Sequence, residues 1–155
     1  MTRAELLASA ARLRAPSPEA ATEYESKALH MAEEIIRIMD LRRDVKRLDG
    51  EDNLEMMHDN HRNHARFIAS LLQAYNPEVL VDTVIWVFRA YLAHGFSLAY
   101  WPAQLDTWVD LFNREFTEKA RMEVYPFYHW MIINQAHFVA LAVKCTEGAK
   151  TEPHH

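Results

Sequence analysis

The chain has 155 residues and a mass of 18.1 kDa, which leaves room for one domain of ordinary size. Half of the residues are hydrophobic and a quarter are charged, which excludes global disorder, while three glycines and six prolines are too few for a turn-rich all-β domain. A net charge of −5 offers no basic field for a nucleic acid, and one cysteine, Cys145, excludes an intramolecular disulfide framework.

Helix-start signals recur along the sequence. Ser17-Pro18 and Asn76-Pro77 each place a capping side chain before a proline at the first helical position, and Tyr125-Pro126 is expected to open or kink the last helix. Helix ends are expected at Asp49-Gly50 and His94-Gly95. We therefore expect an all-α, single-domain bundle of five to six helices. A short leading helix should span 2–14, core helices should span about 18–48, 51–75, 77–94, 102–120 and 126–145, and a disordered tail should span 147–155.

Two of these helices are apolar on nearly every side, over residues 79–92 and 127–143. Such helices are normally buried all round, so they form either a central pair in the bundle or, for the last helix, part of a homodimer interface. Phe127, Tyr128 and Trp130 are residue types that interface cores favour, and we predict a homodimer. Charged or polar residues interrupt both segments, so neither should span a membrane, and we expect a cytoplasmic protein.

The cluster with ligand-like spacing is His58-x-x-His61-x-x-His64, which forms a slanted ridge on one helix. At least one of these imidazoles should point into the bundle, where it must be hydrogen-bonded, paired or metal-bound. An antiparallel hairpin would bring Glu33 and Glu34 near this ridge. The alternatives are a metal site built from His58, His61, His64 and Glu34, or a polar seam in which a tyrosine, a carboxylate or a backbone carbonyl satisfies each ring.

Two further histidines lie at informative positions. His94 precedes Gly95 at a helix end, where a cation offsets the helix dipole. His137 shares a face of the last helix with apolar residues, which makes it either a satisfied core histidine or the candidate axial ligand of a haem.

Sequence signatures of catalysis are absent: there is no Gly-rich phosphate loop, no nucleophile elbow and no His-Glu-x-x-His motif. Cys145 lies near a helix C-terminus, where the dipole disfavours a reactive thiolate. The basic run through Arg43 and Arg47 is interleaved with Asp40 and Asp44, which is typical of a solvated helix face.

Residues 64–95 contain four motifs of note: His64-x-Arg66-Phe67-Ile68-Ala69-x-x-Leu72, Pro77-x-x-Leu80, Val84-x-Trp86 and Tyr91-Leu92-x-x-Gly95. On these motifs, the middle of the chain resembles a helical sensory or regulatory module of bacterial signalling proteins. The resemblance implies a regulatory helical domain with globin-like packing, and it carries over no ligand residue.

Three functions are consistent with these observations. The first is a homodimeric, non-enzymatic sensory domain that binds a partner protein or a small apolar ligand. The second is a metal- or haem-binding bundle that uses the histidine ridge or His137. The third is a small metalloenzyme, which needs that metal site and an open coordination position as well.

Overall fold

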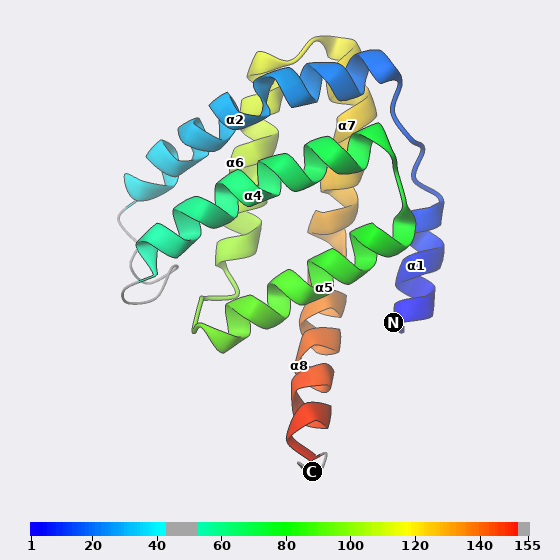
Figure 1. The fold of residues 1–155 in the computed structure, drawn as a ribbon, viewed down its shortest axis with the longest axis vertical. Coiled ribbons are helices and arrows are strands. Elements are labelled where there is room, and N and C mark those ends of the chain that lie inside the picture. The colour runs from blue at the N-terminus through cyan, green and yellow to red at the C-terminus, as the bar shows by residue number, and fades with distance from the viewer. Residues whose placement is uncertain (43–52, 152–155) are drawn as a thin grey trace.

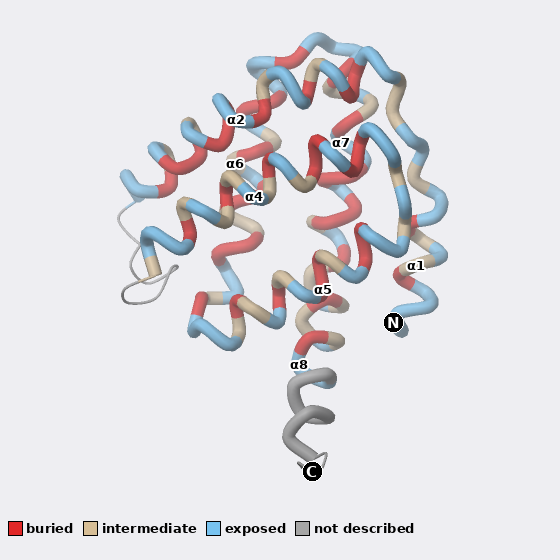
Figure 2. The backbone as a smooth tube through the Cα atoms, in the orientation of Figure 1, coloured by how far each residue is buried: buried red, intermediate tan, exposed pale blue. Residues whose placement is uncertain are grey.

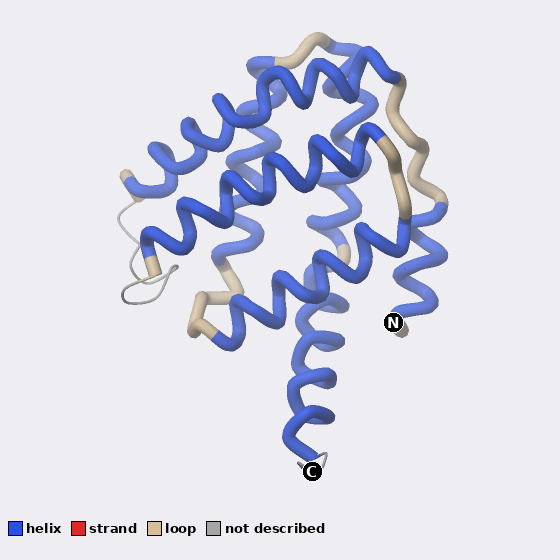
Figure 3. Tube along the Cα trace, in the orientation of Figure 1, coloured by secondary structure: helices blue, strands red, loops and turns tan. Residues whose placement is uncertain are grey.

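The computed structural model describes residues 1–42 and 53–151, with side chains through residue 144. Over these residues the chain forms one all-α domain without a strand, as the sequence predicts, and it has seven helices (Figures 1 and 3). No helix in the described part is long and apolar enough to cross a membrane. The helices are α1 (Arg3–Ala11), α2 (Pro18–Asp40), α4 (Leu54–Gln73), α5 (Pro77–Ala93), α6 (Tyr100–Glu115), α7 (Glu118–Ile133) and α8 (Gln135–Thr151).

The start signals act as predicted at α2 and α5. The Ser17 hydroxyl accepts a hydrogen bond from the Ala20 N–H, and the Asn76 side chain accepts one from the Glu78 N–H at 2.9 Å. The end of α5 also lies where the sequence places it. Gly95 follows α5 with φ of 75°, a conformation that glycine adopts without the strain of a Cβ atom.

The C-terminal third of the chain corrects the predicted number of five to six helices. Residues expected to form two helices form three, because Thr117 caps a helix that begins well before Pro126, and Asn134 separates α7 from α8. Pro126 therefore lies inside α7 and does not open it. Pro126 is exposed and so is Met122, four residues earlier, so the carbonyl that loses its helical donor lies on the outer face of α7.

Two other predicted boundaries concern the ends of the described segments. The expected stop at Asp49-Gly50, and residues 43–48 before it, lie outside the described residues. Residues 147–151, expected in a disordered tail, are the last residues of α8, while 152–155 lie outside the described part.

Helices α2, α4 and α5 lie across the front of the molecule in Figure 1, and α6 and α7 run crosswise behind them. Helix α2 packs closely against α4, α6 and α7, whereas α5 packs mainly against α1 and α8. The α1 contact is reinforced by two hydrogen bonds from the Arg3 guanidinium to Asp82, at 2.8 and 2.9 Å. Helices α4 and α5 are consecutive in the chain but make little direct contact, which leaves space between them for other side chains.

The caps of α2 and α7 are tied to each other. The backbone N–H and hydroxyl of Ser17 both donate to Glu123 at 2.9 Å, while those of Thr117 donate to Glu23 at 2.7 and 2.8 Å. Each helix therefore supplies a carboxylate that accepts hydrogen bonds from the N-cap residue of the other helix. This exchange fixes how α2 crosses α7 at that end of the bundle.

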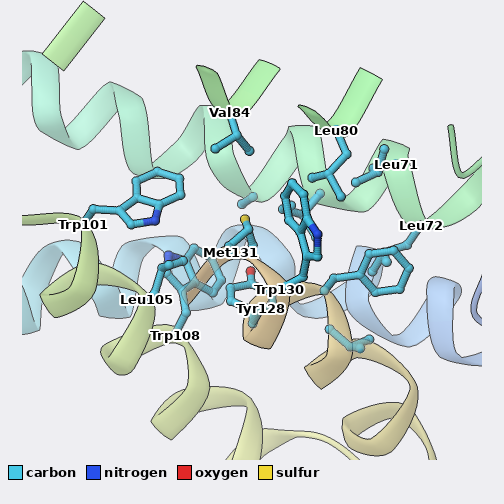
Figure 4. Packing of buried hydrophobic residues seen from close by; sticks show 14 of the residues in the cluster. Leu71, Leu72, Leu80, Val84, Trp101, Leu105, Trp108, Tyr128, Trp130 and Met131 are labelled. Atoms are coloured by element: carbon cyan, nitrogen blue, oxygen red, sulfur yellow. The ribbon is translucent and has the colours of Figure 1, made fainter. Parts of the chain in front are cut away.

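The inward faces of the helices meet in one continuous core (Figure 2). Figure 4 shows Val84 and Leu80 approaching it from α5, with indole rings from α6 and α7 on the opposite side. Phe127, Tyr128 and Trp130 are at most 4% exposed within this single chain. These side chains are therefore not free to form a homodimer interface, and the homodimer stays a prediction without their support.

Candidate functional site

The three histidines of the ridge lie on α4 and reach three different helices. His58 Nε2 lies 2.8 Å from a carboxylate oxygen of Asp40 on α2. His61 Nε2 is hydrogen-bonded to the hydroxyl of Tyr100 on α6, and His64 Nε2 lies 2.9 Å from the hydroxyl of Tyr128 on α7. Each of the three Nε2 atoms therefore has a hydrogen-bond partner, a carboxylate for His58 and a tyrosine hydroxyl for His61 and for His64. This is the arrangement expected for a polar seam.

His64 is one end of a hydrogen-bonded chain that crosses the core, named here the Tyr–His chain (Tyr24, Tyr128, His64). The hydroxyl groups of Tyr128 and Tyr24 lie 2.7 Å apart, and both tyrosines are fully buried. Burial raises the pKa of both hydroxyls, so they stay protonated. Burial lowers the pKa of His64 to about 3, so its ring is neutral at pH 7 and Nε2 can accept the Tyr128 proton. The chain links α4, α7 and α2 without a net charge.

His61 is buried almost completely, with 1% of its surface exposed. Its pKa is lowered to about 3, chiefly by burial and to a smaller extent by the nearby His64 and His58. Its Nδ1 atom has no hydrogen-bond partner among the described residues. His61 is therefore a neutral core histidine anchored on Tyr100 by one of its two nitrogens.

The carboxylates proposed as metal ligands bind arginines. Glu34 accepts a hydrogen bond from Arg37 on its own helix at 2.8 Å, and Glu33 accepts one from Arg62 on α4 at 2.7 Å. Within the described segments, no three histidine, cysteine, aspartate or glutamate side chains are grouped so that they could hold a metal ion. Metal binding by His58, His61, His64 and Glu34 stays a prediction that would require these side chains to leave their present partners.

The remaining candidate residues lie apart from the ridge. His94 is the C-cap of α5, as expected, and its carbonyl accepts a hydrogen bond from Asn53 at 2.8 Å. His137 is half-buried in the first turn of α8, and its haem-ligand role stays a prediction. The side chain of Cys145, and the residues Arg43 and Arg47 of the basic run, lie outside the described part of the structure.

A cavity of about 340 Å³ opens between α4 and α5, where these two helices are not in close contact. It is named here the α4–α5 cavity. Its volume lies at the lower end of the range of small-molecule sites, about 300–1,000 Å³. Its walls come from four helices and the loop after α5: Met56, Asn60, Asn63, His64, Phe67 and Ile68 of α4; Thr83, Val84, Trp86, Val87, Ala90 and Tyr91 of α5; His94 and Phe96; Trp101 and Gln104 of α6; and Met131 of α7.

The α4–α5 cavity has an apolar interior with a few polar groups. Val84, Trp101 and Met131 are buried and supply apolar surface, and Figure 4 shows all three in the same region of the core. Trp86 and Met56 also line the cavity but are 63% and 37% exposed, so they lie at its opening. No lysine, arginine, aspartate or glutamate is among the lining residues in the described part of the chain.

The buried Gln104 and the half-buried His64 are two polar side chains that border the α4–α5 cavity. His64 was expected from the sequence as a possible inward-facing ring, whereas Gln104 was not identified. The available signal was a polar residue among the apolar positions of 101–112, close to Leu105 and Trp108 on the inward face of α6. Neither the cavity nor the tyrosine partners could be read from spacing, because they come from helices far apart in the chain.

Comparisons with protein-family descriptions, with curated proteins and with solved structures found no match to this chain. The resemblance of residues 64–95 to a sensory module thus rests on those residues alone, and globin-like packing is not shown. The identification that the structure supports is an all-helical domain with a buried polar seam and an apolar cavity beside it.

Proposed function

We propose that this chain is a non-enzymatic sensory or regulatory domain that binds a small, mainly apolar molecule in the α4–α5 cavity. The observation that carries the proposal is the cavity itself, which has mainly apolar walls and two inward polar side chains, the buried Gln104 and the half-buried His64. An apolar pocket with a few convergent polar groups is the usual form of a small-molecule site, because apolar surface supplies affinity and the polar groups fix orientation.

The chemistry of the lining favours binding over catalysis. A general acid or base works best with a pKa near the working pH, whereas burial holds the pKa of His64 at about 3. The cavity lining in the described part holds no cysteine or carboxylate that would act as a nucleophile or proton donor. A bound molecule would therefore be held and released unchanged.

The Tyr–His chain connects the α4–α5 cavity to helices α7 and α2. His64 lines the α4–α5 cavity, its ring is hydrogen-bonded to Tyr128, and Tyr128 in turn is hydrogen-bonded to Tyr24 on α2. A ligand that displaces the His64 ring would change the partners of two buried hydroxyl groups. This coupling supports a sensory role, since occupancy of a cavity at α4 and α5 would alter contacts at α2 and α7.

The proposal is tested with indane, a neutral bicyclic hydrocarbon, as the probe. Indane at ten times its dissociation constant should stabilise the folded chain by about 1.4 kcal/mol, a rise of roughly 3–6 °C in Tm for a domain of this size. Isothermal titration calorimetry gives the dissociation constant, and circular dichroism gives Tm.

Ala90 lines the α4–α5 cavity from α5, whereas the exposed Ala93 on the same helix does not. Ala90→Phe should therefore fill the cavity and remove indane binding, while Ala93→Phe, the matched control, should keep it. Absence of any binding to the unmodified chain, or equal binding to both variants, would refute the cavity as a ligand site.

A further inference from the structure

Gln104 differs from the other buried polar side chains of the described core. His61, Gln104 and Asn134 are the polar side chains classed as buried there. The amide nitrogen of Asn134 donates to the Trp130 carbonyl at 2.9 Å, and His61 is bonded to Tyr100. Gln104 Oε1 accepts a long hydrogen bond from Tyr91, at 3.4 Å, and its Nε2 donates no hydrogen bond to the described residues.

The position of this amide points to a ligand. Gln104 is 1% exposed and lines the α4–α5 cavity, so its amide lies beside a space that can hold another molecule. Trp101 lies three positions earlier on the same face of α6 and also lines the cavity, and its Nε1 has no hydrogen-bond partner within the described segments. Buried donors without acceptors are unfavourable. The acceptor of Gln104, its Oε1, already receives the Tyr91 hydroxyl, which leaves the N–H groups of Trp101 and Gln104 as donors on this wall. An acceptor on a bound molecule would satisfy them.

The surroundings also limit the charge of that molecule. No lysine, arginine, aspartate or glutamate lines the α4–α5 cavity within the described segments, and the His64 ring is neutral. His94, the other histidine of the lining, is exposed to solvent at the end of α5. A charged ligand would lose its hydration without gaining a counter-charge, which is strongly unfavourable. A neutral acceptor pays a far smaller desolvation penalty and can still bind an amide N–H.

We propose that the α4–α5 cavity selects a neutral, chiefly hydrocarbon or aromatic molecule that carries a carbonyl oxygen, and that this oxygen accepts a hydrogen bond from Gln104 Nε2. This inference rests on the proposed function, because it names the class of ligand for the same cavity. Trp86 and Met56, exposed at the opening, would cover the apolar part of the ligand.

The test compares indane with 1-indanone, which has the same ring system and one added carbonyl group. The measured quantity is the ratio of their two dissociation constants, so that the general hydrophobicity of each probe cancels between protein variants. Gln104→Met keeps a side chain of similar length but removes the donors. It should weaken 1-indanone binding three- to tenfold relative to indane, whereas Gln73→Leu, at the exposed end of α4, should leave the ratio unchanged.

A spectroscopic readout separates a direct hydrogen bond from a general change in packing. The carbonyl stretch of bound 1-indanone should move to higher wavenumber in Gln104→Met than in the unmodified protein, because the oxygen loses its donor. Circular dichroism checks that Gln104→Met folds, and Gln104→Leu provides a second apolar variant if it does not.

The possible failures are distinguishable. If both probes bind but neither the ratio nor the carbonyl stretch changes in the Gln104 variants, the ligand class is wrong and the proposed function stands. If indane-2-carboxylate binds more tightly than 1-indanone, the inferred neutrality is wrong. If neither indane nor 1-indanone binds, the proposed function itself fails.

Discussion

Replacing Tyr128 with phenylalanine removes the hydroxyl at the centre of the Tyr–His chain while keeping the aromatic ring. His64 Nε2 and the Tyr24 hydroxyl, now 2.9 and 2.7 Å from that oxygen, both lose their partner. A hydrogen bond contributes about 1 kcal/mol, and a buried polar group left unsatisfied costs about 1–3 kcal/mol. Because Tyr24 is fully buried, we expect Tyr128→Phe to lower the free energy of unfolding by about 3 kcal/mol.

Tyr24→Phe removes the other end of the same hydrogen bond and should cost only about 1 kcal/mol, because Tyr128 keeps its bond to His64. In the double variant both hydroxyl groups are absent, so no unsatisfied hydroxyl is left buried at position 24. The double variant should therefore be no less stable than Tyr128→Phe alone, which gives a coupling energy of about 1 kcal/mol between the two sites.

Urea unfolding followed by circular dichroism measures these differences at constant pH. Tyr125→Phe is the control on the same helix, because Tyr125 is 40% exposed, and it should change stability by less than about 0.5 kcal/mol. If Tyr24→Phe costs as much as Tyr128→Phe, or if the two losses add, the reasoning about unsatisfied buried groups in this chain is refuted.

Three further predictions concern other parts of the fold. His61 binds a proton below about pH 6.5 in the unfolded chain but only below about pH 3 in the folded chain, so the free energy of unfolding should decrease as the pH is lowered from 6.5 to 3. His61→Gln should reduce the slope of this free energy against pH, between pH 6 and 5, by up to about 1.4 kcal/mol per pH unit. An unchanged slope would contradict the burial of this ring. Glu23→Ala removes the acceptor of both Thr117 donors and should destabilise the chain by about 1–2 kcal/mol in urea unfolding, whereas Glu25→Ala, on the exposed face of α2, should cost distinctly less. Pro126→Ala restores a backbone donor inside α7 and should raise the free energy of unfolding by about 1–2 kcal/mol; a lower Tm in this variant would show that α7 depends on the proline.

Local chemistry made much of the secondary structure predictable. Ser17 and Asn76 cap helices because their side chains accept backbone N–H groups one turn onward, and Gly95 ends a helix because it tolerates positive φ. These signals involve residues within a few positions of one another, so the sequence alone reveals them. The start of α7 follows the same local rule, because the Thr117 hydroxyl accepts the Ala120 N–H, and the bonds from Thr117 to Glu23 on α2 add a tertiary contact to this cap.

The site depended on distances that no local pattern encodes. The spacing of His58, His61 and His64 predicted a common ridge, but the fold supplies each ring with a different partner, from α2, α6 and α7 in turn. Gln104 is an ordinary polar residue in the sequence. It becomes a candidate binding residue only in the fold, where α4 and α5 separate and its amide lies beside an apolar cavity. The sequence by itself determined an all-helical domain and where most of its helices begin. Only the tertiary structure decided which polar groups were satisfied and which were left to face a cavity, because hydrogen-bond partners and empty volume arise from segments that are brought together by folding.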